Sequence, residues 1–327
     1  MNDIVPDAGV GLSIVVPLKD ESRHIAALLA AIHAALENIE DAYEIILVDD
    51  GSRDNSWRLI TEMAADSRVR GLRFCRNFGK EAALRAGLEH SLGDAVVTMD
   101  ADLQHPPRLL GEMVRRWRSE ATEMVEAVRR DPAKRPFLSQ IGASVVYGIF
   151  RRVTGVDMEG RTDYRLLDRS VVDFICSLPE RATFFRGMVA WYSFSSVPVF
   201  FEVPERAEGR SRWSFLRLVN FGIDVVTSFT NIPLRLMSFF SAGFLAFSAV
   251  LMVQTIYRYV SGHAVEGFTT VILSVLLVGG VVTAGLGIVG EYLARVYEEG
   301  KGRPRYRISE QAGIRPRSIR PCSERER

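Results

Sequence analysis

The chain has 327 residues, of which 47% are hydrophobic and 25% are charged. It can therefore build an apolar core, and its composition excludes an intrinsically disordered chain. Its 41 lysines and arginines nearly balance 40 aspartates and glutamates, which gives no electrostatic argument for a nucleic-acid partner. Three widely separated cysteines exclude a disulfide scaffold and suit a reducing compartment.

Short apolar segments rich in valine and isoleucine recur along the first part of the chain. They are Leu12–Val16, Glu44–Val48, Val69–Phe74, Ala95–Met99 and Met124–Val128. Helical patterns, for example Ile25–Leu36 and Glu81–Leu92, separate the first four. This alternation predicts an α/β fold, a mostly parallel sheet with helices on both faces. Ligands of such sheets bind beyond the carboxyl ends of the strands.

Carboxylates follow two of these predicted strands. Asp49 and Asp50 come after the second, and Asp100 and Asp102 after the fourth. An isolated Asp-x-Asp triplet is often a helix cap or a turn. Here two strands of one predicted sheet end in carboxylates, and no G-x-G-x-x-G or Walker A loop competes for phosphates. The pattern favours a diphosphate bridged by a hard cation such as Mg²⁺.

Two uncharged stretches, Leu236–Tyr257 and Gly267–Gly290, dominate the last third of the chain. Each reaches the length of about 20 residues that a membrane-spanning helix needs. They predict a hairpin of two transmembrane helices, about 236–257 and 267–290, within residues 233–293. Buried helices of a soluble core are the alternative. Glycines in the second stretch favour close helix contact, within the hairpin or between subunits of a homo-oligomer.

The regions outside the hairpin indicate its orientation. Arginines flank both outer ends, whereas the connecting loop has only Arg258, so the positive-inside rule places both outer ends in the cytoplasm. The start of the chain carries no apolar signal segment. We therefore expect a cytoplasmic α/β domain over 1–205, an amphipathic segment over 206–232 that lies at the membrane interface or is buried, and a basic cytoplasmic tail over 294–327.

Seven motifs in this order resemble those of the inverting glycosyltransferases of family 2, which have the GT-A fold. The similarity is closest to membrane-bound polyprenyl-phosphate (bactoprenol) glucosyltransferases, relatives of dolichol-phosphate mannose synthase, and runs from about Leu12 to Arg307. The motifs are Ile14–Glu21, Val48–Ser52, Arg76–Glu81, Gly93–Ala95, Asp100–Gln104, Asp163–Arg169 and Gly290–Leu293.

The resemblance implies a set of site residues. Asp50 would contact the nucleotide base, Asp100 and Asp102 would hold Mg²⁺ or Mn²⁺, and Asp163, with Asp102, would be catalytic. Lys80 would lie close to the nucleotide, unless it is a solvated lysine at a helix start. The nucleotide-sugar contacts would be Pro17, Lys19, Glu21, Asp49, Asp50, Lys80, Asp100, Ala101, Gln104 and Arg129. The acceptor lipid phosphate would meet Arg206, Arg210 and Arg212, which also fit a positive membrane flank.

The implied reaction moves glucose from UDP-glucose to undecaprenyl phosphate at the cytoplasmic face of a bacterial inner membrane, with inversion at C1. A lipid monophosphate is mostly ionised at pH 7, because its second pKa is about 6. The acceptor thus needs orientation more than deprotonation. Other donors (UDP-aminoarabinose, GDP-mannose or a UDP-N-acetylhexosamine) keep every motif. A processive synthase lacks support, since no Gln-x-x-Arg-Trp motif occurs; a membrane scaffold or flippase partner with a degenerate nucleotide fold is the alternative from another class.

Three positions depart from the family pattern. Glu126 stands where relatives more often have a small or neutral residue. Glu159–Thr162 replaces the usual acidic or glycine approach to the Asp163 motif. Arg212-Trp213 replaces Ser-Lys-Tyr, which keeps the charge but changes its hydrogen-bond geometry.

Overall fold

The computed structural model describes residues 11–37, 39, 42–130, 161–178, 185, 188–189, 192–202, 232–261 and 268–313. The chain forms two compact units. The first comprises Met1–Trp213 together with Arg303–Arg327, and the second comprises Ser214–Gly302.

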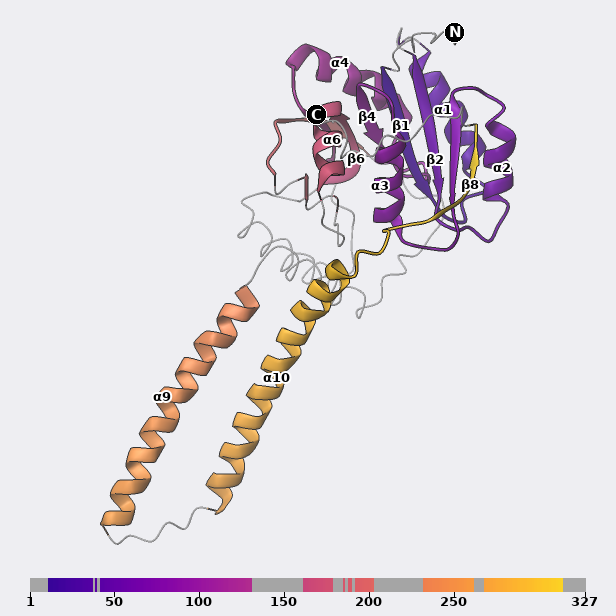
Figure 1. The fold of residues 1–327 in the computed structure, drawn as a ribbon. Helices are drawn as coiled ribbons and strands as arrows, with labels where there is room; N and C mark the ends of the chain where they lie inside the picture. The colour runs from indigo at the N-terminus through magenta and orange to yellow at the C-terminus, as the bar shows by residue number, and fades with distance from the viewer. Residues whose placement is uncertain are drawn as a thin grey trace, which may run out of the picture. The chain divides into compact units, whose positions relative to one another are not determined.

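A single eight-stranded sheet in the order β7-β5-β6-β4-β1-β2-β3-β8 organises the first unit (Figure 1). Six strands run in one direction, and β6 and β8 run against them. The strands are β1 (Leu12–Leu18), β2 (Tyr43–Asp49), β3 (Val69–Phe74), β4 (Ala95–Thr98), β5 (Met124–Arg129), β6 (Arg161–Asp168), β7 (Ser196–Phe201) and β8 (Ile308–Ala312).

Helices cover both faces of this sheet, and each face has its own apolar core. One core packs α1, α2 and α4 against the sheet, and the other packs α3 and α6. The strands between the two cores are buried on both sides, which explains their continuous valine and isoleucine runs. The helices are α1 (Ile25–Leu36), α2 (Ser56–Met63), α3 (Lys80–His90), α4 (Leu110–Glu120) and α6 (Arg169–Ser177), with a short 3₁₀ turn η1 (Pro107–Leu109) before α4.

The predicted α/β architecture is confirmed. The five predicted strands and the helix Ile25–Leu36 occur where expected, and the helix predicted over Glu81–Leu92 spans Lys80–His90. Three strands were not predicted: β6, β7 and β8. β6 lies between β4 and β5 and is antiparallel to both, so it brings the Asp163 motif into the middle of the sheet.

The edge strand β8 comes from the segment that the sequence indicated only as a basic tail. It pairs antiparallel with β3. The Trp57 indole donates a hydrogen bond to Glu310 at 2.8 Å, and Arg73 forms an ion pair with the same carboxylate at 2.6 Å. Tyr306 stacks on Phe74 with 5.0 Å between ring centroids. These contacts fasten the chain after the second unit to the sheet.

The second unit contains two long helices, α9 (Ile232–Val260) and α10 (Phe268–Gly300). Within the described residues, only α10 has a stretch long and apolar enough to cross a membrane, Leu277–Ala294; the apolar run in α9, Phe239–Gln254, is shorter. Helices therefore occur at both predicted positions. Of the two membrane spans that the sequence predicted, only the second meets this criterion of length and apolarity within the described residues. Gly285 on α10 lies against Met237 of α9, because a Cβ there would collide with the Met237 side chain. The predicted interfacial segment, 206–232, lies outside the described residues except for its last position.

Candidate active site

The loops after β1 and β2 interlock at the carboxyl edge of the sheet. The Asp20 amide donates to Ser52 Oγ at 2.9 Å, and the Arg53 amide donates to Asp20 Oδ1 at 2.8 Å. Asp20 itself has a φ of +55°, a left-handed conformation that such side-chain contacts stabilise. The two loops therefore form one rigid shelf beside the ends of β1 and β2.

The predicted residues of the first loop lie on or beside this shelf. Pro17 is still within β1 and pairs with Val48 of β2. Lys19 follows the strand and is exposed. The Glu21 amide donates to a serine hydroxyl at the start of α2 at 3.1 Å, and its carboxylate lies 2.6 Å from the His24 ring. Of Pro17, Lys19 and Glu21, Lys19 is the one with an exposed charged side chain.

Asp49 and Asp50 have different surroundings. Asp49 is fully buried and accepts a hydrogen bond from the Ser52 amide at 2.8 Å; burial raises its pKa. Asp50 accepts hydrogen bonds from the amides of Phe78 at 2.6 Å and Gly79 at 3.0 Å. Burial also raises the Asp50 pKa, against these two hydrogen bonds. Asp50 thus fixes the loop before α3, and a nucleotide base would have to use its remaining lone pairs.

A three-residue ionic cluster forms where α3 begins. Lys80 is the first residue of α3, and its Nζ lies 2.5 Å from Asp100 Oδ1 and 2.9 Å from Asp163 Oδ2. Burial alone would lower the Lys80 pKa, but the two carboxylates hold it above its ordinary value. Lys80 is therefore a paired cation at neutral pH, with a side chain that is 40% exposed at the start of α3. That it lies close to a nucleotide stays a prediction.

Strand β6 positions Asp163 in this cluster. Because β6 is antiparallel to β4, its first residues lie beside the end of β4, where Asp100 follows. The Thr98 hydroxyl donates to the Asp163 carbonyl oxygen at 2.6 Å. Residues separated by more than 60 positions in the sequence thus share one site.

The segment after Asp100 carries the remaining polar groups of the predicted metal site. Asp102 is exposed, and both its oxygens accept hydrogen bonds from Gln104, at 3.1 Å from the amide and 2.6 Å from the side chain. Ala101 between the two aspartates is buried. His105 Nδ1 accepts a hydrogen bond from the Asp100 amide at 2.9 Å, and burial lowers the His105 pKa. A neutral ring in this arrangement carries its proton on Nε2, so His105 is a donor rather than a metal ligand.

The donor set suits a hard cation whose coordination a substrate completes. Asp100, 30% exposed, and the exposed Asp102 supply carboxylate oxygens beside an amide oxygen of Gln104. Within the described part of the chain, no three His, Cys, Asp or Glu side chains converge on one point. Mg²⁺ and Mn²⁺ sites that also bind phosphates need only one or two protein carboxylates. These residues therefore fit such a cation when a diphosphate is present.

Of the four arginines predicted to bind phosphate, the structure describes only Arg129. Arg129 ends β5 at the same edge of the sheet, and its Nε is buried with no hydrogen-bond partner among the described residues. Arg206, Arg210 and Arg212 lie outside the described residues.

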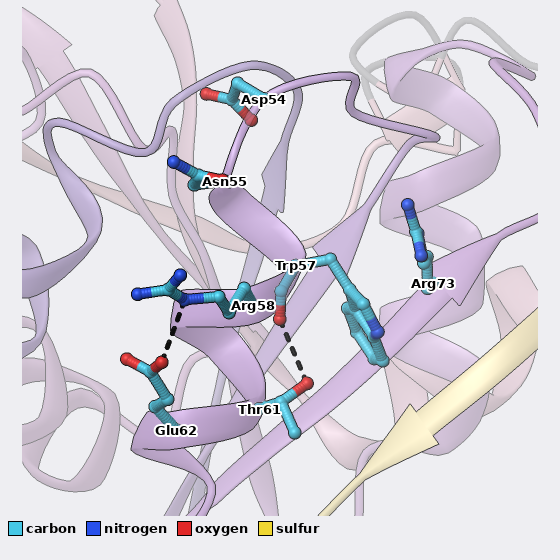
Figure 2. A pocket seen from close by; sticks show the side chains of 7 residues that line it. All are labelled: Asp54, Asn55, Trp57, Arg58, Thr61, Glu62 and Arg73. Atoms are coloured by element: carbon cyan, nitrogen blue, oxygen red, sulfur yellow. Dashed lines mark hydrogen bonds and ion pairs between the residues drawn. The ribbon is translucent and has the colours of Figure 1, made fainter.

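A separate pocket of about 400 Å³ lies on α2 and β3 (Figure 2). Its two arginines already pair with carboxylates: Arg58 with Glu62 at 3.0 Å, and Arg73 with Glu310 at 2.6 Å. None of its lining residues belongs to the Lys80 cluster. The lining residues are Asp54, Asn55, Trp57, Arg58, Thr61, Glu62 and Arg73.

Comparison with known proteins identifies the family. The model of the family described as glycosyl transferase family 2 matches residues 13–172. An uncharacterised glycosyltransferase from Synechocystis sp. is 37% identical over 311 residues, which cover 93% of this chain and 96% of that protein. The chain belongs to glycosyltransferase family 2. It is therefore an enzyme of the transferase class, as the motifs predicted.

Other relatives of this family 2 glycosyltransferase carry more specific names. The bactoprenol glucosyl transferase of Shigella phage SfX is 35% identical over 304 residues, covering 91% of this chain and 98% of that protein. Among solved structures, the glucosyl-3-phosphoglycerate synthase of Mycobacterium tuberculosis in complex with Mn²⁺, UDP-glucose and phosphoglyceric acid superposes with a TM-score of 0.51. That match has 20% identity and covers 67% of this chain and 78% of the other. It confirms the GT-A-like fold.

Proposed function

We propose that this enzyme transfers glucose from UDP-glucose to a polyprenyl phosphate, such as undecaprenyl phosphate, at the cytoplasmic face of a bacterial inner membrane. The observation that carries the proposal is the full-length similarity to proteins named bactoprenol glucosyl transferase, at 34% to 35% identity over 91% of the chain. The intact cluster of Lys80, Asp100 and Asp163 supports an active rather than a degenerate site.

The membrane arrangement is part of the proposal. We propose that α9 and α10 form a two-helix hairpin that spans the bilayer and leaves both termini and the catalytic unit in the cytoplasm. The apolar stretch Leu277–Ala294 supports one span, and the arginines outside the hairpin support the orientation. Gly285 against Met237 supports close packing of the two helices. A homo-oligomer remains a prediction from the sequence.

The donor half of the proposed site lies over Asp100, Asp102 and Gln104. These residues would hold Mg²⁺ or Mn²⁺, and the bound cation would offset the charge of the departing nucleoside diphosphate. Lys80 adds a fixed positive charge at the same place. The M. tuberculosis enzyme, which shares the fold, was solved with Mn²⁺ and UDP-glucose. The other residues proposed to contact the donor lie at the ends of β1 and β2 and in the loops that follow, together with two residues near β4 and β5. They are Pro17, Lys19, Glu21, Asp49, Asp50, Ala101 and Arg129.

The acceptor half follows from the chemistry of a phosphate monoester. At pH 7 its oxygen is already mostly ionised, so we assign Asp163 an orienting role or the stabilisation of positive charge that develops on the sugar. The ion pair with Lys80 at 2.9 Å holds the Asp163 carboxylate in place. Arg206, Arg210 and Arg212 would bind the lipid phosphate, because arginine can bind phosphate through two hydrogen bonds. Direct attack in line with the leaving group would invert C1.

The test is transfer of radiolabelled sugar to undecaprenyl phosphate by the purified full-length protein in detergent, across a panel of nucleotide sugars. We expect labelled lipid from UDP-glucose, abolished by EDTA and by Asp102→Asn. Label from another donor alone would overturn the sugar assignment and keep the reaction type. No labelled lipid from any donor, with folded protein and added Mg²⁺ or Mn²⁺, would overturn the proposed function.

A further inference from the structure

Glu126 pairs with the two arginines that flank Asp163 in the sequence. Its carboxylate lies 2.6 Å from the Arg161 guanidinium and 3.3 Å from that of Arg165. Glu126 is 3% exposed and Arg165 is fully buried, whereas the Arg161 side chain is 27% exposed. Glu126 and Arg161 are also two of the positions at which the sequence departs from the family pattern. The two departures form one ion pair.

Asp163 lies in an irregular part of β6, between these two arginines. Glu126 of β5 pairs with Arg165 of β6, but Val128 pairs with Arg161. One residue of β5 therefore faces three residues of β6, so β6 bulges there. Bulges re-aim side chains and are common next to active sites. At this bulge, Asp163 contacts Lys80, the first residue of α3. The Lys80 side chain also contacts Asp100, which follows β4.

Hydrogen bonds close the bulge from within. The Thr162 hydroxyl donates to the Ala127 carbonyl at 2.8 Å and accepts the Tyr164 amide at 3.2 Å. Arg165 Nε donates to the Thr162 carbonyl at 3.1 Å. Arg165 thus touches the bulge through its Nε, and its Nη2 forms an ion pair, without a hydrogen bond, with Glu126 Oε1. The other oxygen of Glu126 pairs with Arg161 on the far side of the bulge.

We propose that Glu126 is a positioning residue for the transfer reaction. By binding Arg161 and Arg165 at the same time, its carboxylate fixes both ends of the bulge and so holds Asp163 against Lys80. Glu126 acts through Asp163 and needs no contact with the substrate. The proposal rests on the proposed function, because it takes Asp163 to act on the acceptor or the sugar.

Two single variants test this in the transfer assay, Glu126→Gln and Arg161→Gln. We expect each to lower kcat about 10-fold and to leave the KM for the donor within about 2-fold, because the proposed donor contacts come mainly from other loops. Loss of the Glu126 charge removes an ion-pair partner of the buried Arg165 and destabilises the protein. Arg161→Gln keeps the Glu126–Arg165 pair, so it decides the question if Glu126→Gln does not fold.

A matched control separates positioning from stability. Glu44 is 5% exposed and pairs with Arg70 at 2.6 Å near the opposite, amino-terminal edge of the sheet. Glu44→Gln should lower the melting temperature and leave kcat unchanged. In an Asp163→Asn background, Arg161→Gln should change kcat less than 2-fold, since the group that it positions is already gone.

The outcomes are distinguishable from failure of the proposed function. If the wild-type protein transfers no sugar, the function itself fails. If the wild type is active, an unchanged kcat in folded Arg161→Gln overturns the positioning role, and so does an equal 10-fold loss in the Asp163→Asn background. A rise in donor KM alone would also overturn it, because the pair would then contact the donor.

Discussion

Lys80 determines the charge of the proposed site in the described structure. Its Nζ lies within ion-pair distance of both Asp100 and Asp163. Two carboxylates facing one position repel each other unless a cation lies between them. Lys80 therefore offsets this repulsion, and its contact with Asp100 through Oδ1 leaves Oδ2 for a metal cation.

Two replacements of Lys80 should distinguish the contribution of its positive charge from that of its side-chain shape. We expect Lys80→Met to lower kcat about 100-fold, the order found when a charged or polar group that stabilises a transition state is removed. Lys80→Arg should lose less because the charge remains. The measurement is the transfer assay at saturating donor, with Lys301→Met as a lysine control in the second unit. Wild-type kcat in Lys80→Met would contradict this role.

Asp66 provides a prediction about pH that is independent of catalysis. Hydrogen bonds from Arg68, the closest at 2.7 Å, lower the Asp66 pKa from 3.8 to about 2. A carboxyl whose pKa is lower in the folded state stabilises the fold above the unfolded-state pKa, and this contribution disappears as pH falls towards 2. The full shift corresponds to about 2.4 kcal/mol, and solvent screening of this partly exposed pair reduces the expectation to about 1 kcal/mol.

We therefore expect Asp66→Asn to destabilise the protein at pH 7 and to approach wild-type stability between pH 3.8 and pH 2. Thermal unfolding of both proteins across this range measures the difference. Glu62→Gln is the control, since its ion pair with Arg58 is largely exposed. A constant difference between Asp66→Asn and wild type at all pH values would contradict the assignment.

The sequence predicted the acidic residues of the site but not their contacts. Asp100 and Asp102 could be placed at the end of a strand because apolar runs identify strands directly. The contact of Lys80 with Asp163 could not, because it depends on where β6 inserts into the sheet. Glu126 seemed only an unusual residue in a strand until the structure paired it with Arg161.

At the scale of elements, the turn after β2 and the loop before α3 depend on each other. Gly51 has a φ of +68°, and a Cβ there would lie 2.6 Å from the Arg76 carbonyl carbon. The neighbouring Asp50 fastens the same loop through the amides of Phe78 and Gly79. A side chain at position 51 would therefore displace the loop that leads into Lys80.

We expect Gly51→Ala to destabilise the protein by about 1–3 kcal/mol, from backbone strain and from this collision. It should also lower kcat, because Lys80 follows the displaced loop. Thermal unfolding and the transfer assay measure the two effects. Gly111→Ala is the control: it lies in α4 with open space around it, where alanine is neutral or stabilising. Equal stability of the two variants would contradict the argument.

Most strands that the sequence predicted are apolar runs buried on both faces. β1, β2 and β4 are continuous apolar runs, and α1 has apolar residues at helical spacing. β6 has the sequence RTDYRLLD. Its charged residues, including the buried Arg165 and the candidate catalytic residue Asp163, interrupt the apolar run that would identify a strand. β8 is mostly exposed and polar because it is an edge strand. Only tertiary pairing defines these two strands.

At the scale of the whole molecule, the two units differ in how far their apolar side chains are exposed. The core of the first unit is enclosed between its sheet and helices. The second unit exposes large apolar side chains along both helices, including Phe239 at 76%, Val282 at 54% and Leu286 at 67%. Apolar surfaces of this extent on a soluble protein mark a membrane or protein contact. The proposed bilayer would cover them.

Charges placed in the apolar stretch of α10 test this directly. Val282→Arg with Leu286→Arg lies near the centre of Leu277–Ala294. Each arginine at the centre of a spanning helix costs about 2.5–3.5 kcal/mol of insertion free energy, so the double variant should lose about 5–7 kcal/mol. We expect it to move from the membrane pellet to the soluble or aggregated fraction after an alkaline carbonate wash.

The control for this variant is Leu92→Arg, which adds a charge at a residue of the first unit that is 42% exposed. It should stay in the membrane pellet like the wild type, because it changes no residue of the proposed span. If the double α10 variant also stays in the pellet after the wash, α10 does not cross the bilayer. Attachment would then depend on α9 or on the catalytic unit, and the hairpin would have to be abandoned even if the transfer reaction is confirmed.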